Sequence, residues 1–137
     1  MKDVKVLIPL LSKLENNPVF LDRACEGAKE IIVLAVIDRS LMVGQFGFCA
    51  SEMMAANDVM EEMRKAIGQK RKTCNDIVEW GDTLQKTVNI AKIHSVDKIF
   101  LARQDNKYFE EIAGGLEREL GKKKIEIVEI REVQPEK

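Results

Sequence analysis

The sequence has little of what marks a metal site, a secreted disulfide scaffold or a membrane span. It holds one histidine and three cysteines, and no two cysteines form a C-x-x-C pair. An odd cysteine count without such spacing is typical of a reducing compartment and indicates no metal cluster. No apolar run approaches the roughly 20 residues that cross a bilayer, and residues 1–5 lack a signal-peptide core. We therefore expect a cytoplasmic protein with no metal and no membrane partner.

A surplus of charge of either sign is also missing. The 22 Lys and Arg residues nearly balance the 23 Asp and Glu residues, which leaves a formal net charge of −1. Nucleic-acid-binding domains usually carry a basic field, so we expect no nucleic-acid partner. The chain of 137 residues is 45% hydrophobic, which suits one domain spanning residues 1–137 with a core of its own.

Apolar runs alternate with amphipathic stretches along the chain. Nearly continuous apolar runs predict strands that are covered on both faces. A half-polar run, residues 74–80, predicts a strand at a sheet edge. The predicted strands are residues 4–11, 31–37, 74–80, 96–102 and 124–133.

Local start and stop signals predict a helix in each gap between these strands. Asn17 followed by Pro18 is a favoured helix start, and Asp82 lies three residues before Gln85 in a capping pattern. A helix over about 51–72 follows an irregular segment at 39–50. The last helix starts from Asp105 or Asn106, and Gly121 is expected to end it in the left-handed conformation.

A strand-helix alternation of this kind predicts a fold class. Parallel strands joined by right-handed helical crossovers form an open, doubly wound α/β sheet with helices on both faces. In such a sheet, ligands bind beyond the carboxyl ends of the strands where the winding reverses.

Four segments resemble the universal stress protein family. They are K-V-L-I-P at 5–9, V-L-A-V-I-D at 33–38, V-E-W-G-D at 78–82 and V-D-K-I-F-L at 96–101. The resemblance implies a five-stranded parallel sheet in the order 3-2-1-4-5 and a homodimer formed through the last strand. The dimer strand would then contribute Ile125, Ile127, Val128 and Ile130, although the charges between them also suit an edge protected against pairing.

The resemblance also places a nucleotide crevice between strands 1 and 4. Members of the family that bind ATP carry an Asp after strand 1 and a G-x2-G-x9-G-[S/T] run after strand 4. Here the Asp position holds Leu11, and the two first glycines are replaced by Ala102 and Asp105. Gly115 keeps the third glycine, but Leu116 follows it in place of Ser or Thr.

These departures predict a degenerate nucleotide site. The Cβ of Ala102 narrows the approach to the backbone, and the Asp105 carboxylate would repel a phosphate. We predict that the chain does not bind ATP tightly in the family manner and has no cofactor. Its role would then be regulatory or interaction-based rather than enzymatic. The residues assigned to the crevice are Leu10, Ser12, Val36, Ala102, Arg103, Asp105 and Gly115.

An alternative function is a nucleotide-dependent switch. ATP or AMP would be held by non-standard contacts from Ser12, Val36, Arg103 and Gly115. Ser12, Arg103 and Lys107 could meet an anion, but exposed charges are the default, so we interpret Arg103 and Lys107 as solvated loop charges.

The remaining residues with chemical potential have ordinary interpretations. His94 is expected to cap the C-terminus of a helix, and Cys25 to be a small core residue. Cys49 and Cys74 could sense redox changes, without a motif in support. Met42, Met53, Met54, Met60 and Met63 are expected to pack in the core. The alternative for them is contact with a protein partner, which Phe46 and Phe48 in the adjacent loop favour.

Overall fold

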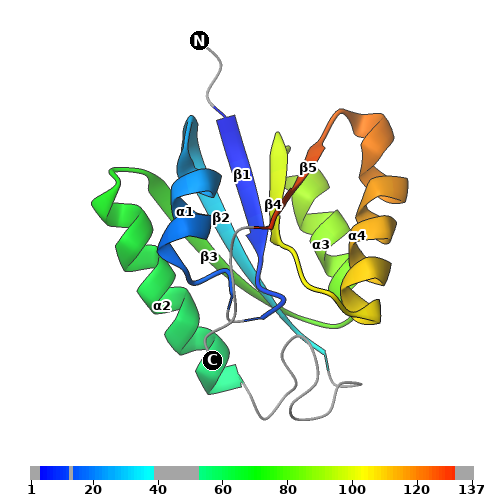
Figure 1. The fold of residues 1–137 in the computed structure, drawn as a ribbon, viewed down its shortest axis with the longest axis horizontal. Coiled ribbons are helices and arrows are strands. Elements are labelled where there is room, and N and C mark those ends of the chain that lie inside the picture. Colours follow the sequence, from blue (N-terminus) through cyan, green and yellow to red (C-terminus); the bar gives the residue numbers. More distant parts are fainter. Residues whose placement is uncertain (1–3, 13, 39–52, 132–137) are drawn as a thin grey trace.

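A computed structural model describes residues 4–12, 14–38 and 53–131. The interpretations of Met42, Phe46, Phe48 and Cys49 concern residues outside these ranges. Figure 1 shows the elements in order. They are β1 (Val4–Pro9), α1 (Pro18–Cys25), β2 (Ala28–Ile37), α2 (Met53–Gln69), β3 (Thr73–Trp80), α3 (Thr83–Ile93), β4 (Lys98–Ala102), α4 (Lys107–Leu120), a 3₁₀ turn (Gly121–Lys123) and β5 (Glu126–Ile130).

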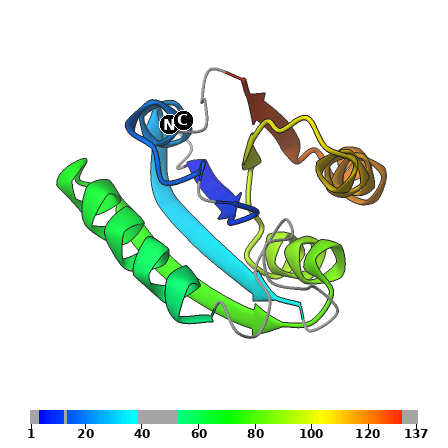
Figure 2. The same cartoon turned by 60° about the horizontal axis from the view of Figure 1, so that its bottom comes forward.

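The strands form one parallel sheet in the order β3-β2-β1-β4-β5, which confirms the predicted topology. β1 pairs with β2 along its whole length, but with β4 only at Val6–Lys98 and Leu7–Ile99. The winding reverses at β1, so the carboxyl ends of β1 and β4 mark the switch point of the fold. Figure 2 shows α1 and α2 on one face of the sheet, and α3 and α4 on the other.

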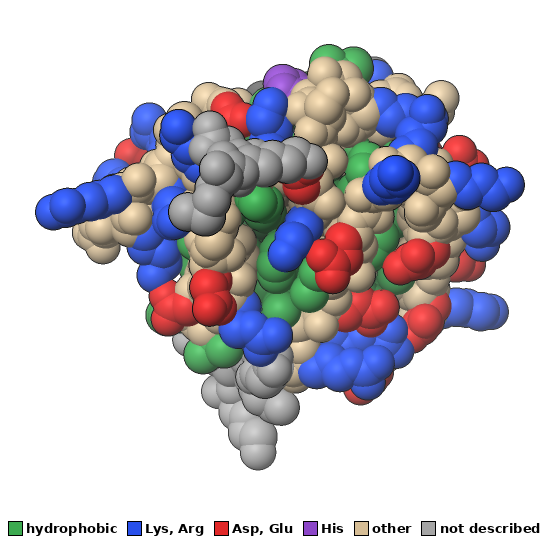
Figure 3. All heavy atoms as spheres, turned by 90° about the horizontal axis from the view of Figure 1, so that it is seen from above, with side chains coloured by type: hydrophobic (Ala, Val, Ile, Leu, Met, Phe, Trp, Pro, Cys, Tyr) green, Lys and Arg blue, Asp and Glu red, His purple; other side chains and the backbone are tan. Residues whose placement is uncertain are grey.

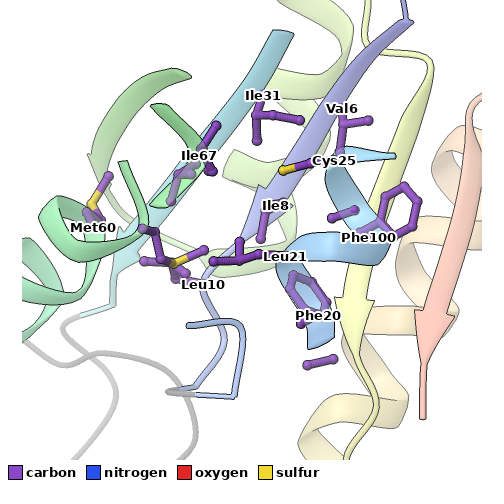
Figure 4. Packing of buried hydrophobic residues seen from close by; sticks show 14 of the residues in the cluster. Val6, Ile8, Leu10, Phe20, Leu21, Cys25, Ile31, Met60, Ile67 and Phe100 are labelled. Atoms are coloured by element: carbon purple, nitrogen blue, oxygen red, sulfur yellow. The ribbon is translucent and has the colours of Figure 1, made fainter. Parts of the chain in front are cut away.

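The two faces of the sheet carry separate hydrophobic cores. Side chains of β1 alternate between them: Val6 and Ile8 pack toward α1 and α2, while Leu7 packs toward α3 and α4. Figure 4 shows Leu21 of α1 close to Ile8, with Met60 of α2 and Phe20 of α1 on either side of them in the first core. Burial on both faces is why the central strands appear in the sequence as unbroken apolar runs.

Three predicted helix starts are confirmed by the capping side chains. The Asn17 side chain accepts a hydrogen bond from the backbone N–H of Val19, and that of Asp82 from Gln85. Asn106, rather than Asp105, caps α4 by accepting from the N–H of Phe109 at 2.7 Å. Each cap satisfies one N–H group that has no partner within its helix.

The predicted stop at Gly121 is wrong. Gly121 has a right-handed φ of −56° and begins a 3₁₀ turn, and the left-handed residue is Lys124 at φ 63°. Left-handed residues occur at every helix-to-strand turn: Gly27, Arg71, Ser95 and Lys124. Only the first turn uses glycine, the residue that adopts this conformation without strain.

The strand boundaries differ from the prediction at positions where a side chain is buried but its backbone is not paired in the sheet, or the reverse. β1 ends at Pro9, although Leu10 and Leu11 remain fully buried. The chain turns into a loop there while its apolar side chains stay in the core. β2 begins at Ala28, because Ala28 and the charged Glu30 both pair with β1, and Lys29 lies at a register shift between them. β4 and β5 are shorter than predicted.

Candidate functional site

Two loops leave the sheet at the switch point. The first runs from Leu10 to Asn17 after β1, and the second from Arg103 to Asn106 after β4. Their positions are fixed by backbone hydrogen bonds into the sheet. The N–H of Leu10 donates to the carbonyl of Leu34 at 2.7 Å, and the N–H of Arg103 to that of Ile130 at 2.9 Å.

Glu15 in the first loop is the feature that sequence reasoning missed. Its side chain is fully buried and accepts hydrogen bonds from the N–H of Ser12 at 3.0 Å and from the Ser12 hydroxyl at 3.2 Å. Burial raises the pKa of Glu15 to about 8, although these hydrogen bonds favour the charged form. The Ser12-x-x-Glu15 spacing, a capping pattern without a helix, was the available signal.

Ser12 is therefore engaged by its own loop. Its hydroxyl oxygen also accepts from the N–H of Leu14 at 3.1 Å, so the residue closes a tight turn around the Glu15 carboxyl group. A side chain that already holds these partners is not presented to a ligand in this structure.

Arg103 in the second loop is held by three carboxylates. Its guanidinium pairs with Glu110 of α4, with Glu129 of β5 at 3.0 Å and with Asp105 at 4.0 Å. It also lies over the Phe109 ring, 5.1 Å from the centroid. The hydrogen bonds that Arg103 donates to Glu110 and Glu129 raise the pKa of its guanidinium. The interpretation of Arg103 as a solvated loop charge is therefore wrong, whereas Lys107 is exposed.

The other predicted crevice residues do not gather around an open site. Leu10, Val36 and Ala102 are buried in the two cores, while the Asp105 side chain is 99% exposed. Gly115 lies in the middle of α4, where an added Cβ would lie 2.4 Å from Cδ2 of Leu84. In this structure Gly115 serves the close packing of α4 on α3.

One polar group in the second loop has no partner. The Oε1 of Gln104 accepts from the Nδ2 of Asn106 at 3.3 Å, while the Nε2 of Gln104 is buried without a hydrogen bond. Because Asn106 uses its Oδ1 to cap α4, the orientation of both amides is fixed by their neighbours. Gln104 thus offers a donor at the switch point that a bound acceptor could satisfy.

The histidine, the described cysteines and the described methionines have structural surroundings rather than reactive ones. His94 is the C-cap residue of α3, as predicted, and Cys25 is buried in the core. Burial, with Asp76 nearby, raises the pKa of the Cys74 thiol to about 12, which disfavours the reactive thiolate. Met60 and Met63 are core residues as predicted, whereas Met54 is 80% exposed.

Across the described ranges, no group of three or more His, Cys, Asp or Glu side chains could hold a metal ion. The helices described there are also too short or too polar to cross a membrane.

Comparison with solved structures identifies the fold. Hypothetical protein MJ0577 aligns with 96% of this chain and 99% of its own, at 21% identity and a TM-score of 0.67. Universal stress protein UspA from Lactobacillus plantarum covers the same shares at 13% identity and a TM-score of 0.66. A universal stress protein in complex with cAMP aligns with 96% of this chain and 98% of its own, at 12% identity and a TM-score of 0.62.

The chain has the universal stress protein fold. The likeness covers nearly the whole chain, and the strand order of the sheet is the one that the family resemblance implied. No protein-family model and no curated protein matches the sequence. A structural likeness at such low identity establishes the fold alone, so function has to be argued from the site.

Proposed function

We propose that this chain is a universal stress protein-like regulatory or interaction domain of the cytoplasm, which does not bind ATP in the family manner and catalyses no reaction. The observation that supports this most is the occupied guanidinium of Arg103. It is the cation of the β4–α4 loop, and carboxylates from α4 and β5 already pair with it.

Three further features of the switch point also disfavour the binding of ATP. Leu11 replaces a polar contact with a buried aliphatic side chain. The Ala102 methyl group limits backbone approach, and Asp105 adds a negative charge beside Arg103. A triphosphate would have to displace the carboxylates from Arg103 and accept their repulsion.

Isothermal titration with ATP and Mg²⁺ tests this proposal. We expect no binding in the micromolar range, because Arg103 is already paired with carboxylates and does not meet the phosphates. Arg103→Gln should leave this result unchanged, since the wild-type guanidinium is not available to the ligand. A micromolar Kd for the wild-type protein would contradict the proposal.

A nucleotide-dependent switch is the second candidate. Its support is the unpartnered Nε2 of Gln104 at the switch point and the existence of a universal stress protein in complex with cAMP among proteins of similar structure. A ligand with one phosphate or none would meet less repulsion than ATP. Mass spectrometry of the purified and denatured protein would reveal a co-purified adenine nucleotide and would favour this candidate.

A homodimer formed through β5 is part of the proposal. β5 lies at the edge of the sheet, where an antiparallel copy could pair with it across a two-fold axis. The N–H of Glu126 donates to Asp97 and the carbonyl of Ile130 accepts from Arg103, so both residues bond toward β4. By the alternation of a strand, Val128 bonds toward β4 as well, whereas Ile127 and Glu129 direct their backbone groups outward.

Ile127→Pro is therefore the sharpest test of β5 pairing. Proline removes an outward N–H and leaves the hydrogen bonds to β4 in place, so we expect a shift from dimer to monomer by light scattering. Val128→Pro breaks the bonds to β4 instead and serves as the control for general damage to the strand. An unchanged mass for Ile127→Pro would exclude pairing through this edge.

A further inference from the structure

The charges of this chain are not evenly distributed over the fold. Because the strands are parallel, all four helix-to-strand turns lie at the end of the sheet where the strands begin. Two of these turns carry consecutive basic residues, 70–72 between α2 and β3 and 122–124 between α4 and β5. The overall net charge of −1 therefore conceals a local surplus of positive charge.

Several of these cations have no partner. Lys5, Lys70 and Lys98 at this end pair with Glu30, Asp22 and Glu126. Within the described part of the chain, seven others at this end form no ion pair, and we call them the basic end. They are Arg71, Lys72, Lys92, Arg118, Lys122, Lys123 and Lys124.

Acidic side chains reduce this surplus without cancelling it. Glu26, Glu117 and Glu119 lie at the same end, also without an ion pair in the described residues. Figure 3 views the molecule from this end and shows Lys and Arg side chains around much of its perimeter, with acidic side chains among them.

The two basic turns flank opposite edges of the sheet, since β3 and β5 are its edge strands. Five strands at normal spacing separate them by about 20 Å. Lys92, at the end of α3, lies on the α4 side of this span, and it lines one hollow together with Glu119 of α4. The basic end is thus broad, and it is formed by turns.

Two residues of the basic end occupy strained backbone positions, as the neutral Ser95 of the turn between α3 and β4 also does. Arg71 and Lys124 occupy left-handed positions with φ of 62° and 63°, where glycine would avoid strain. The equivalent turn between α1 and β2 uses Gly27. Both charged residues therefore cost stability that glycine would recover.

An exposed apolar side chain decides between possible anionic partners. Ile93, the last residue of α3, is 73% exposed and follows Lys92 directly. The other large apolar side chains exposed in the described residues are Val19, Met54 and Trp80, and Trp80 lies at the opposite end of β3. A lysine-rich surface with a protruding aliphatic side chain suits a lipid interface, whereas single-stranded nucleic acids are bound by aromatic stacking.

We propose that the basic end is a docking surface for an anionic lipid membrane, with Ile93 entering the interface and the unpaired lysines contacting the headgroups. This surface is remote from the switch point, so the proposal does not depend on whether the chain binds nucleotide. It revises the expectation of no membrane partner, which rested on the absence of a spanning segment and of a signal-peptide core.

Flotation with vesicles of phosphatidylserine and phosphatidylcholine tests the proposal on the full chain. We expect binding that weakens with added salt and disappears on pure phosphatidylcholine. Changing Lys122, Lys123 and Lys124 together to Gln should weaken binding about one hundredfold, at roughly fivefold per lysine. The matched control changes Lys86, Lys107 and Arg131 to Gln, which removes the same charge from unpaired residues at the opposite end of the sheet.

Two further variants separate membrane contact from folding. Lys124→Gly should raise the urea midpoint, because it relieves the left-handed strain, and still weaken vesicle binding. Ile93→Ser should weaken binding without changing its dependence on salt. Failure of the wild-type protein to bind phosphatidylserine vesicles at low salt would overturn the proposal. Equal loss in the basic-end and control triple variants would overturn it too, as would binding to an oligonucleotide but not to vesicles.

Discussion

Glu15→Gln is expected to stabilise this protein by about 3 kcal/mol at pH 7. The Glu15 carboxyl group is fully buried, and burial raises its pKa from 4.5 to about 8. Each unit of that shift corresponds to about 1.4 kcal/mol. At pH 7 the Glu15 carboxyl group is ionised in the unfolded chain and neutral in the folded protein, and this difference lowers the free energy of unfolding. Glutamine keeps an oxygen that accepts from Ser12 and cannot ionise.

The direction of the pH dependence follows from linkage. An acid whose folded pKa is raised binds more protons in the folded than in the unfolded state between the two pKa values. The wild-type protein should therefore have its full stability below pH 4.5, lose it steadily from pH 4.5 to about 8, and lose no more from this group above that. Glu15→Gln should lack this decline.

Urea unfolding of both proteins at several pH values between 4 and 9 measures the difference. The two curves should meet near pH 4 and separate as pH rises. Ser12→Ala is the useful comparison, because it removes the hydroxyl partner of Glu15 and leaves the carboxyl group buried. Parallel curves for wild type and Glu15→Gln across this range would show that Glu15 does not titrate with a raised pKa.

Glu15 also shows why the fold was easier to predict than the site. The helix starts and the covered strands, such as the run from Val33 to Ile37, follow from local patterns that the sequence displays directly, and the strand order was implied by the family resemblance. Whether a polar residue in a loop is buried depends on how the loop folds over the core, which no local pattern specifies. The sequence alone therefore does not distinguish Glu15 from the other polar residues of its loop.

Arg103 illustrates the same limit for charges. Its partners, Glu110 and Glu129, are 7 and 26 residues away in sequence and belong to different elements. The resemblance placed Arg103 near the switch point correctly, but only the packing of α4 and β5 reveals that its charge is already balanced. The segregation of cations at the basic end is likewise a property of the topology, which collects separate turns at one end of the sheet.

The second large effect concerns Leu11, the position where relatives that bind ATP carry Asp. The Leu11 side chain is fully buried, in the same hydrophobic core as Leu7 and Phe109. Leu11→Asp should destabilise the protein by about 5 kcal/mol or more, because it removes a buried leucine, worth about 2–5 kcal/mol on truncation to alanine, and also buries a carboxylate without a partner. A loss of this size approaches the whole stability of many domains.

Leu11→Ala separates these two contributions. It leaves the same cavity without the charge, so the difference between the two variants in urea unfolding at pH 7 reports the cost of burying the carboxylate. That difference should shrink at pH 4, where the aspartate can bind a proton. We also expect Leu11→Asp to bind ATP no better than wild type, because the carboxylates around Arg103 and the Ala102 methyl group remain. A stable Leu11→Asp variant that binds ATP would show instead that one side chain alone keeps the site closed.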